Sequence, residues 1–177
     1  MIDLASRSGL ALLREVTGLP RRPAGLAAEQ RCEFVVEEAS VRDFAMSFAH
    51  LVNAAELDAV VAAYTDDCMV ISPRGQYAGR EAVRRNYQAY FDPVRWFSFW
   101  TNVTVRFIRP FDEAYVSAYQ YSIGVHTSEP GAQGAVSTDV WRVRRAGDSW
   151  QIAERRIDIL TGHDHRVLLP TASAGVR

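Results

Sequence analysis

An aspartate inside a strand-like segment is the first residue of this sequence that could do chemistry. Asp139 lies in "STDVWRVRRAGDSW", where strand alternation places it on the same face as Trp141 and Val143. A carboxylate on an apolar face is costly unless it is paired, neutral or used in catalysis. Because burial favours the protonated form of a carboxyl, Asp139 is a candidate general acid or base.

The structural alternative for Asp139 is an ion pair with one of the strand arginines. Alternation sends Arg142 and Arg144 to the opposite face of the same strand, which weakens this alternative. The sequence therefore favours a catalytic role for Asp139 over a purely structural one.

A second group of polar candidates lies on the long strand predicted over residues 113–126. One face carries Gln120, Ser122 and His126 among small residues, which is typical of a ligand site. His126 is the candidate acid/base partner of Asp139, or else an exposed histidine at a hairpin end. The other face carries Tyr115, Tyr119, Tyr121, Ile123 and Val125, which predicts a dimer surface or the underside of an N-terminal helix.

Aromatic residues offer further contacts for a substrate. In "RWFSFW", Trp96 or Trp100 could stack on a flat polycyclic molecule, with core packing as the alternative. Tyr64 and Tyr87 lie on buried helix faces, as hydroxyl donors or as plain core. The two histidines of "GHDH", residues 162–165, lack further convincing ligands, so we expect no metal site there.

The spacing of apolar residues, which indicates the elements that position these candidates, changes along the chain. Helical spacing is predicted from Ser40, over residues 55–64 and over residues 79–91, with a short amphipathic helix before Pro20. From Trp100 onward the period is two, as in a run of antiparallel strands joined by short turns. Helices followed by a bent sheet predict an α+β fold.

Composition excludes several classes of function. The chain has 177 residues, 48% apolar content and a net charge of −1, which gives no reason to expect nucleic acid or membrane as a partner. All 20 basic residues are arginine, so Schiff-base chemistry through a lysine is excluded. With only Cys32 and Cys68 and no signal peptide, we expect a cytoplasmic protein that needs no cofactor.

The order and spacing of "NAAELDAVVAAYTDDCMVISPRG", "GREAVRRNY" and "DVWRVRRAGDSWQIAERR" resemble the SnoaL-like family of the nuclear transport factor 2-like superfamily. The resemblance implies an α+β cone, in which three N-terminal helices pack on a strongly curved antiparallel sheet that encloses a pocket. It implies an extension over residues 1–37, a domain over residues 38–162 and a tail over residues 163–177.

The resemblance also carries residues over one at a time. Asp139 stands where SnoaL-like polyketide cyclases have a catalytic aspartate, ketosteroid isomerases an oxyanion-hole aspartate and scytalone dehydratase an asparagine. Ser72 replaces the general base of ketosteroid isomerases, and Phe48 replaces their oxyanion tyrosine, so that mechanism is not expected. Ala118 and Gln120 likewise replace two charged residues of limonene epoxide hydrolase.

These observations predict a cofactor-independent enzyme of bacterial secondary metabolism, and a homodimer. It would catalyse acid/base cyclisation, isomerisation or dehydration of a polyketide-like or polycyclic small molecule. The alternative is a non-catalytic binding protein or an assembly subunit like the β subunits of oxygenases. Asp139 and His126 are the predicted catalytic residues. The predicted substrate contacts are Gln120, Ser122, Trp141, Trp100, Tyr64, Tyr87, Ser72, Ser137 and Phe48.

Overall fold

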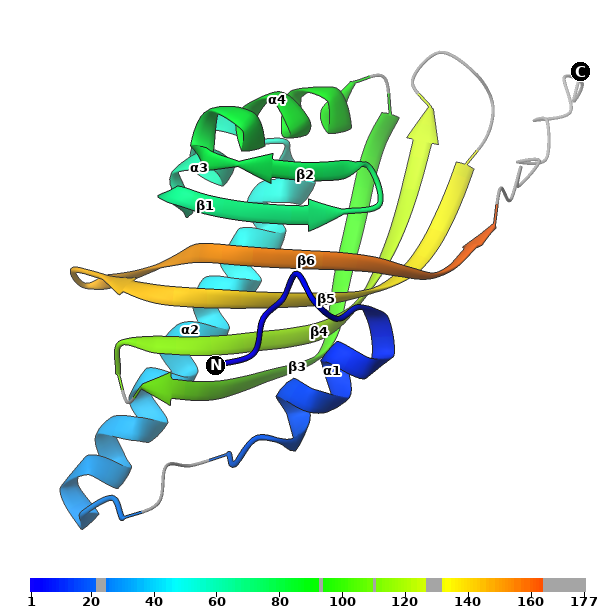
Figure 1. Cartoon of the computed structure of the whole chain (residues 1–177). Coiled ribbons are helices and arrows are strands. Elements are labelled where there is room, and N and C mark those ends of the chain that lie inside the picture. Colours follow the sequence, from blue (N-terminus) through cyan, green and yellow to red (C-terminus); the bar gives the residue numbers. More distant parts are fainter. Residues whose placement is uncertain (22–24, 93, 110, 127–131, 164–177) are drawn as a thin grey trace, which may run out of the picture.

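A six-stranded, curved and unclosed sheet forms the body of the protein in the computed structural model (Figure 1). The structure describes residues 1–21, 25–92, 94–109, 111–126 and 132–163. The helices are α1 (Gly9–Gly18), α2 (Ala28–Ala54), α3 (Leu57–Ala62) and α4 (Gly79–Phe91). The strands are β1 (Tyr64–Ser72), β2 (Gly75–Ala78), β3 (Val94–Arg109), β4 (Glu113–His126), β5 (Ala132–Ala146) and β6 (Ser149–His163). The predicted α+β class is confirmed.

The strands lie in the order β2-β1-β6-β5-β4-β3. Neighbours are antiparallel except β1 and β6, which run parallel because the chain crosses from β1 through β2, α4 and the β3–β5 meander before β6. The register between β3 and β4 shifts by one residue between Thr101 and Thr104, and Asn102 takes a positive φ of 54°. Such a bulge bends its strand, which helps the sheet to curve.

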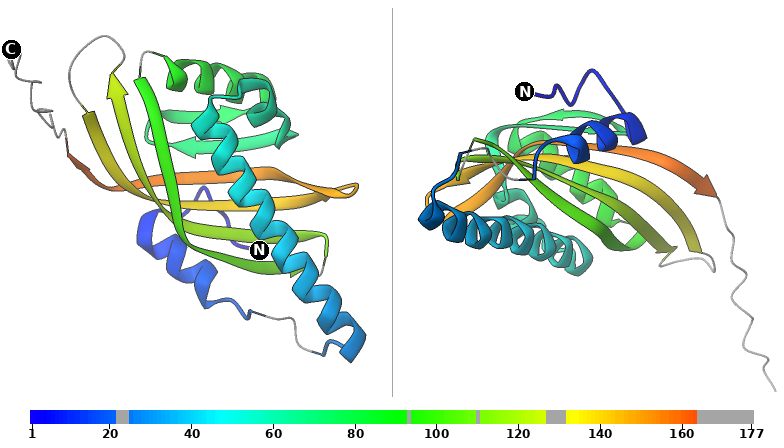
Figure 2. Two further views of the ribbon diagram at one scale, coloured as in Figure 1. Left: turned by 180° about the vertical axis from the view of Figure 1, so that it is seen from behind. Right: turned by 90° about the horizontal axis from the view of Figure 1, so that it is seen from below.

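Helices cover both faces of the sheet (Figure 2). Helix α2 crosses the inner face, where Phe48 and Val52 join the main core together with Val83 and Tyr87 of α4. Helix α1 lies on the outer face, where Leu12, Leu13 and Val16 pack in a second cluster that includes the strand residues Tyr115 and Val140. The curved sheet is thus buried on one side by α2 and α4 and partly covered on the other by α1.

The first long helix begins earlier than the sequence predicts. The expected N-cap was Ser40, but α2 runs without a break from Ala28 to Ala54 and crosses the predicted boundary at residue 38. Phe34 and Val41 are fully buried on its inner face, so the apolar spacing continues on both sides of Ser40. Within the described ranges, no helix combines the length and the apolarity needed to cross a bilayer.

Candidate active site

A cavity of about 160 Å³ lies on the inner face of the sheet, bounded by α4 and by the turn between β1 and β2. Its walls are largely apolar, and the polar groups among its described lining residues are hydroxyls, amides, one indole nitrogen and two arginines. Those polar lining residues are Ser72, Arg74, Asn86, Tyr87, Tyr90, Trp96, Gln120, Ser122, Ser137 and Arg155. No described lining residue carries a carboxylate. An apolar cavity with a few convergent polar groups is typical of a small-molecule site.

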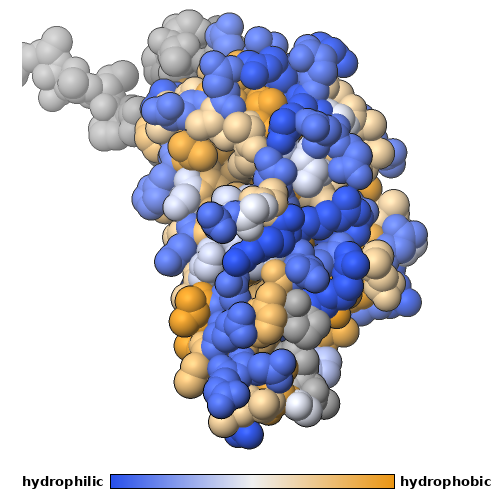
Figure 3. Space-filling view, turned by 90° about the vertical axis from the view of Figure 1, so that its left-hand side faces the viewer, coloured by the Kyte–Doolittle hydropathy of each residue, from blue (hydrophilic) through white to orange (hydrophobic). Residues whose placement is uncertain are grey.

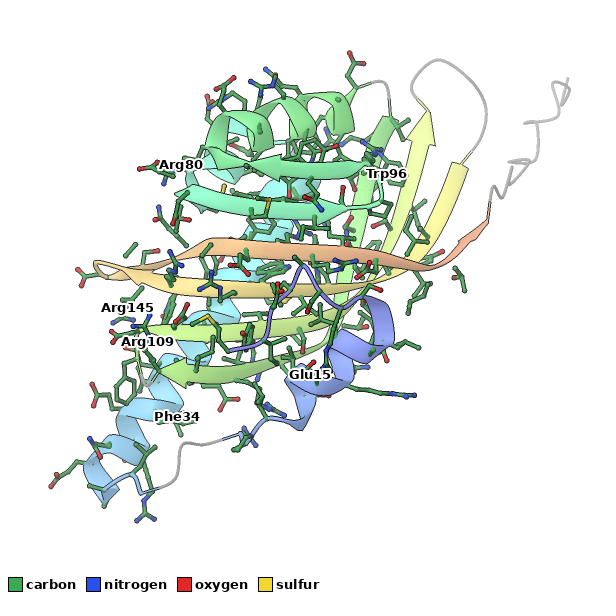
Figure 4. All side chains as sticks on the ribbon, in the orientation of Figure 1. Glu15, Phe34, Arg80, Trp96, Arg109 and Arg145 are labelled. Atoms are coloured by element: carbon green, nitrogen blue, oxygen red, sulfur yellow. The ribbon has the colours of Figure 1, made fainter. Side chains whose placement is uncertain are left out.

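Two ion pairs lie at the opposite end of the sheet. Arg145 of β5 binds Glu37 of α2 at 2.5 Å, and Arg80 binds Asp66 at 2.8 Å. Figure 4 labels both arginines at this end of the molecule, whereas Trp96 lies at the other end, beside the β1–β2 turn. The space-filling view of the end that carries the two ion pairs shows hydrophilic residues with apolar patches between them (Figure 3). The exposed lining residues Pro73, Arg74 and Ile159 mark the mouth of the cavity.

Asp139 has an arginine partner, which lies on the neighbouring strand rather than its own. Arg155 of β6 donates from Nε to Asp139 Oδ1 at 3.0 Å and from Nη2 to Oδ2 at 2.6 Å. The indole nitrogens of Trp141 and Trp100 donate to the same two oxygens, at 2.5 and 2.8 Å. These four bonds fill the acceptor sites of the carboxylate. Asp139 is also not among the described residues that line the cavity.

Arg155 joins this buried group to the cavity. Its side chain is only 3% exposed, yet it belongs to the cavity lining, which Asp139 does not. Its remaining terminal nitrogen, Nη1, donates to the hydroxyls of Tyr87 at 2.5 Å and Tyr64 at 3.2 Å. The guanidinium also lies 5.2 Å from the ring centroid of Phe48. Asp139 therefore orients Arg155, and Arg155 in turn orients two tyrosine hydroxyls.

The direction of the hydrogen bond between two tyrosine hydroxyls decides which of them can donate to a ligand. The hydroxyls of Tyr64 and Tyr87 both accept from Arg155 and lie 3.1 Å from each other, so one hydrogen occupies the link between them. Tyr64 is fully buried and does not line the cavity, whereas Tyr87 does. When Tyr64 donates to Tyr87, the hydrogen of Tyr87 is left to donate to a ligand.

The surroundings keep both tyrosines protonated and Arg155 charged. Burial raises the pKa of Tyr87 well above its usual value and outweighs the opposing effect of Arg155, and burial likewise raises the pKa of Tyr64. Burial disfavours the charged form of Arg155, but Asp139 and the two hydroxyls hold the pKa of the guanidinium well above its usual value. Tyr87 is thus a hydrogen-bond donor that is backed by a permanent positive charge.

A second polar group lies farther along β4. Gln120 Nε2 donates to the hydroxyl oxygens of Ser98 and Ser122, at 3.0 and 3.1 Å, and these two hydroxyls lie 2.9 Å apart. Ser137 Oγ lies 3.4 Å from Gln120 Oε1. Gln120, Ser122 and Ser137 line the cavity, so this network presents polar groups to a ligand.

The structure divides the predicted site residues into those that line the cavity and those buried with Asp139, and the side chain of His126 lies outside the described residues. Five of them line the cavity: Gln120, Ser122, Tyr87, Ser72 and Ser137. Four are buried around Asp139 and Arg155 and do not line it: Tyr64, Trp100, Trp141 and Phe48. The hydroxyl of Ser72 accepts a bond from the backbone nitrogen of Arg74 at 3.2 Å and so supports the β1–β2 turn.

The backbone register does not support the predicted pairing of His126 with Asp139. Asp139 lies opposite Ala118 on β4, whereas His126 lies opposite Val94, eight residues farther along the same strand. Eight residues of strand span about 26 Å. The side chain of His126 itself lies outside the described residues, as does most of "GHDH". Among the described residues, no three His, Cys, Asp or Glu side chains are placed to hold a metal ion.

Sequence patterns missed the residue that links the two parts of the site. Alternation from Trp150 and Ile152 predicts that position 155 faces outward, but the β5–β6 register shifts by one residue at Ala153. This bulge turns Arg155 to the inner face, together with Ile157 and Ile159 of the cavity wall. The signal in the sequence was an arginine that alternates with these two isoleucines.

A family model for the SnoaL-like domain matches residues 34–156. The chain belongs to the SnoaL-like family. The resemblance drawn from the sequence is therefore confirmed, and the matched range includes the cavity-lining residues Ser72, Tyr87, Gln120 and Arg155. None of the curated proteins matches the chain.

Solved structures show the same fold at low sequence identity. A protein named for scytalone dehydratase from Novosphingobium aromaticivorans aligns with a TM-score of 0.70 and 17% identity, over 80% of this chain and 93% of its own. A ketosteroid isomerase-like protein from Erwinia carotovora atroseptica aligns with a TM-score of 0.61 and 22% identity, over 71% and 97%. ActVI-ORFA from Streptomyces coelicolor aligns with a TM-score of 0.58 and 12% identity, over 68% and 95%. At such identities the likeness establishes the fold alone.

Proposed function

We propose that this protein is a lyase- or isomerase-type enzyme that acts on a polyketide-like or polycyclic small molecule. The observation that carries the proposal is the hydroxyl of Tyr87, which lines the cavity, stays protonated because of its burial and accepts a hydrogen bond from the charged Arg155. A substrate carbonyl or hydroxyl oxygen that gains negative charge would accept a hydrogen bond from this hydroxyl when Tyr64 donates to Tyr87. One such oriented donor contributes about 10²–10³-fold to a rate. Cyclisation, isomerisation and dehydration all develop charge on an oxygen.

In this proposal Asp139 is a positioning residue rather than the acid or base predicted from the sequence. Its four acceptor sites are filled, and its carboxylate is separated from the cavity by Arg155. It holds the guanidinium in the one orientation that presents Nη1 to Tyr64 and Tyr87. His126 remains the proposed base, on the face of β4 that alternation shares with Gln120 and Ser122. We further propose a cytoplasmic homodimer that needs no cofactor.

Exchange of hydrogen for deuterium next to a carbonyl tests this proposal without knowledge of the natural substrate. The probe is 2-tetralone, a bicyclic ketone, whose α-hydrogens are followed by proton NMR in D₂O. We expect the protein to accelerate the exchange over buffer and Tyr87→Phe to lower that acceleration by about 10²-fold. Tyr121→Phe, on the outer face of the sheet, is the matched control and should exchange like the wild type.

The absence of a carboxylate among the described lining residues favours a second candidate, a protein that binds a small molecule without turning it over. Calorimetry with the same ketone separates the two. Binding of 2-tetralone without accelerated exchange would contradict the enzyme and support the binding protein. Accelerated exchange that Tyr87→Phe leaves unchanged would contradict the role of Tyr87.

A further inference from the structure

Three side chains form a layered stack at the mouth of the cavity. The ring of Tyr90, from α4, stacks on Trp96 of β3 with 5.3 Å between the ring centroids and 12° between the planes. The guanidinium carbon of Arg74 lies 5.2 Å from the centroid of the Tyr90 ring. All three residues line the cavity. The stack thus joins the β1–β2 turn, α4 and the sheet at one point.

The sheet holds this stack from below. Trp96 lies opposite Gly124 of β4, and a Cβ atom at Gly124 would come within 2.9 Å of the Trp96 ring and 2.8 Å of Val94. The indole therefore occupies the space that a side chain at position 124 would need. On the other side, the bond from the Arg74 backbone nitrogen to Ser72 Oγ fixes the turn. The Trp96 ring and the turn that carries Arg74 are thus held in place before any ligand binds.

The charge at this mouth is unbalanced. The other arginine of the cavity, Arg155, is compensated by Asp139, so the pair contributes no net charge. Arg74, in contrast, forms no ion pair and no side-chain hydrogen bond within the described part of the chain. No carboxylate on the described walls neutralises Arg74, so it places an unpaired positive charge at the mouth.

The contact with Tyr90 leaves the donors of Arg74 available. The contact of a guanidinium with the face of an aromatic ring uses none of its N–H donors, which lie in the plane of the guanidinium. These donors match the two oxygens of a carboxylate, with which arginine forms paired hydrogen bonds. Tyr90 therefore holds Arg74 in a position to bind an anion without consuming the donors that would bind it.

We propose that Arg74 is a specificity-determining residue that binds a carboxylate on the substrate at the mouth of the cavity. The proposal rests on the cavity being the substrate site. It identifies the ligand as a planar, apolar body with an acidic group at the end that faces solvent and an oxygen acceptor at the end that faces Tyr87. The Tyr90–Trp96 pair forms the aromatic wall beside that acidic group.

Two probes that differ in charge but hardly in shape test this assignment. Binding of 2-naphthoate and 2-naphthamide is measured by calorimetry at pH 8 and low salt. We expect the wild type to bind 2-naphthoate more tightly and to lose this preference as salt is added. Arg74→Gln should weaken 2-naphthoate binding by about tenfold or more, the loss expected for a charge-assisted pair, and change 2-naphthamide binding less than about twofold.

Arg85→Gln is the matched control. It removes the same charge as Arg74→Gln, but Arg85 lies on α4 and does not line the cavity. It should leave both affinities unchanged. Equal binding of the two probes, failure of the wild type to bind 2-naphthoate, or equal losses in the two variants would overturn the proposal. An intact Tyr87-dependent exchange reaction with no effect of Arg74→Gln would overturn this inference alone. An effect of Arg74→Gln in a protein that catalyses no exchange would overturn the enzymatic function alone.

Discussion

The guanidinium of Arg155 and the carboxylate of Asp139 face each other across two neighbouring strands with two hydrogen bonds, of 3.0 and 2.6 Å. Both side chains are almost completely buried, at 3% and 0% exposure. A buried pair of this kind is costly to form but much more costly to break, because removal of one partner leaves an uncompensated charge in the interior. The pair is therefore a single unit, on which the orientation of Tyr87 depends.

The first prediction is that Asp139→Asn destabilises the protein. The amide fills the same space but leaves Arg155 without a counter-charge, and the expected loss is about 3–5 kcal/mol of the free energy of unfolding. Denaturant unfolding of the variant and of the wild type measures it. The double variant Asp139→Asn with Arg155→Met is the control and should recover part of the loss. A single variant that unfolds like the wild type would show that the pair is not structural.

The pairing of these two residues illustrates how far sequence patterns reach. Strand alternation correctly placed Arg142 away from Asp139, and the structure pairs Arg142 instead with the buried Glu113, at 2.7 Å. Alternation within one strand cannot reveal a partner on the next strand. The bulge at Ala153, which turns Arg155 inward, adds one residue to β6 and reverses the expected face. Strand alternation predicts which face of the sheet a side chain lies on only as far as the next β-bulge in that strand.

Other elements follow from local pattern alone. The helix predicted over residues 79–91 is α4, because its apolar positions Val83 and Tyr87 recur at helical spacing and a glycine precedes them. The strands predicted after Trp100 are present, but β3 already begins at Val94. The parallel contact of β1 with β6 pairs Met69 with Glu154, 85 positions later in the sequence. The cavity is likewise lined by segments far apart in the sequence, and no local pattern encodes such contacts.

The second prediction concerns stability at alkaline pH. An unfolded tyrosine loses its proton near pH 10, whereas burial raises the pKa of Tyr87 well above that value. The folded state therefore holds a proton that the unfolded state releases, so this contribution is fully present below about pH 10 and is lost as the pH rises further. Unfolding free energies measured from pH 8 to 11.5 should fall above pH 10. The free energy of unfolding should fall less steeply with pH in Tyr87→Phe than in the control Tyr121→Phe. Equal slopes in the two variants would contradict the raised pKa of Tyr87.

The third prediction tests the packing of Trp96 on the sheet. Gly124→Ala places a methyl group within 3 Å of Trp96 and Val94, and overpacking of this kind costs about 1–3 kcal/mol. Gly134→Ala is the matched control, since the nearest atom to its new methyl group would be 3.6 Å away. Thermal melts should show a loss for Gly124→Ala only, accompanied by a change in tryptophan fluorescence. Two variants with the same melting temperature would contradict the close contact.

The fourth prediction addresses the outer face of the sheet and the proposed homodimer. The first residues of the chain already cover Tyr115, whose hydroxyl donates to the carbonyl of Ile2 at 2.8 Å, so this end of the face is not available to a partner. Phe97, Phe99 and Tyr121 remain 40–52% exposed at the other end, where cross-strand pairing brings Phe99 opposite Tyr121. Clustered apolar side chains of this size are typical of an interface.

Light scattering should therefore report about twice the chain mass of 19.8 kDa. Phe99→Glu places a charge in the exposed patch and should shift the protein to a monomer with an unchanged melting temperature at low concentration. Val35→Glu is the control, because Val35 is also 52% exposed but lies on α2, away from the outer face. A wild type that remains monomeric at high concentration would contradict the dimer. Within the described part of the chain, only the N-terminal residues would then cover this face.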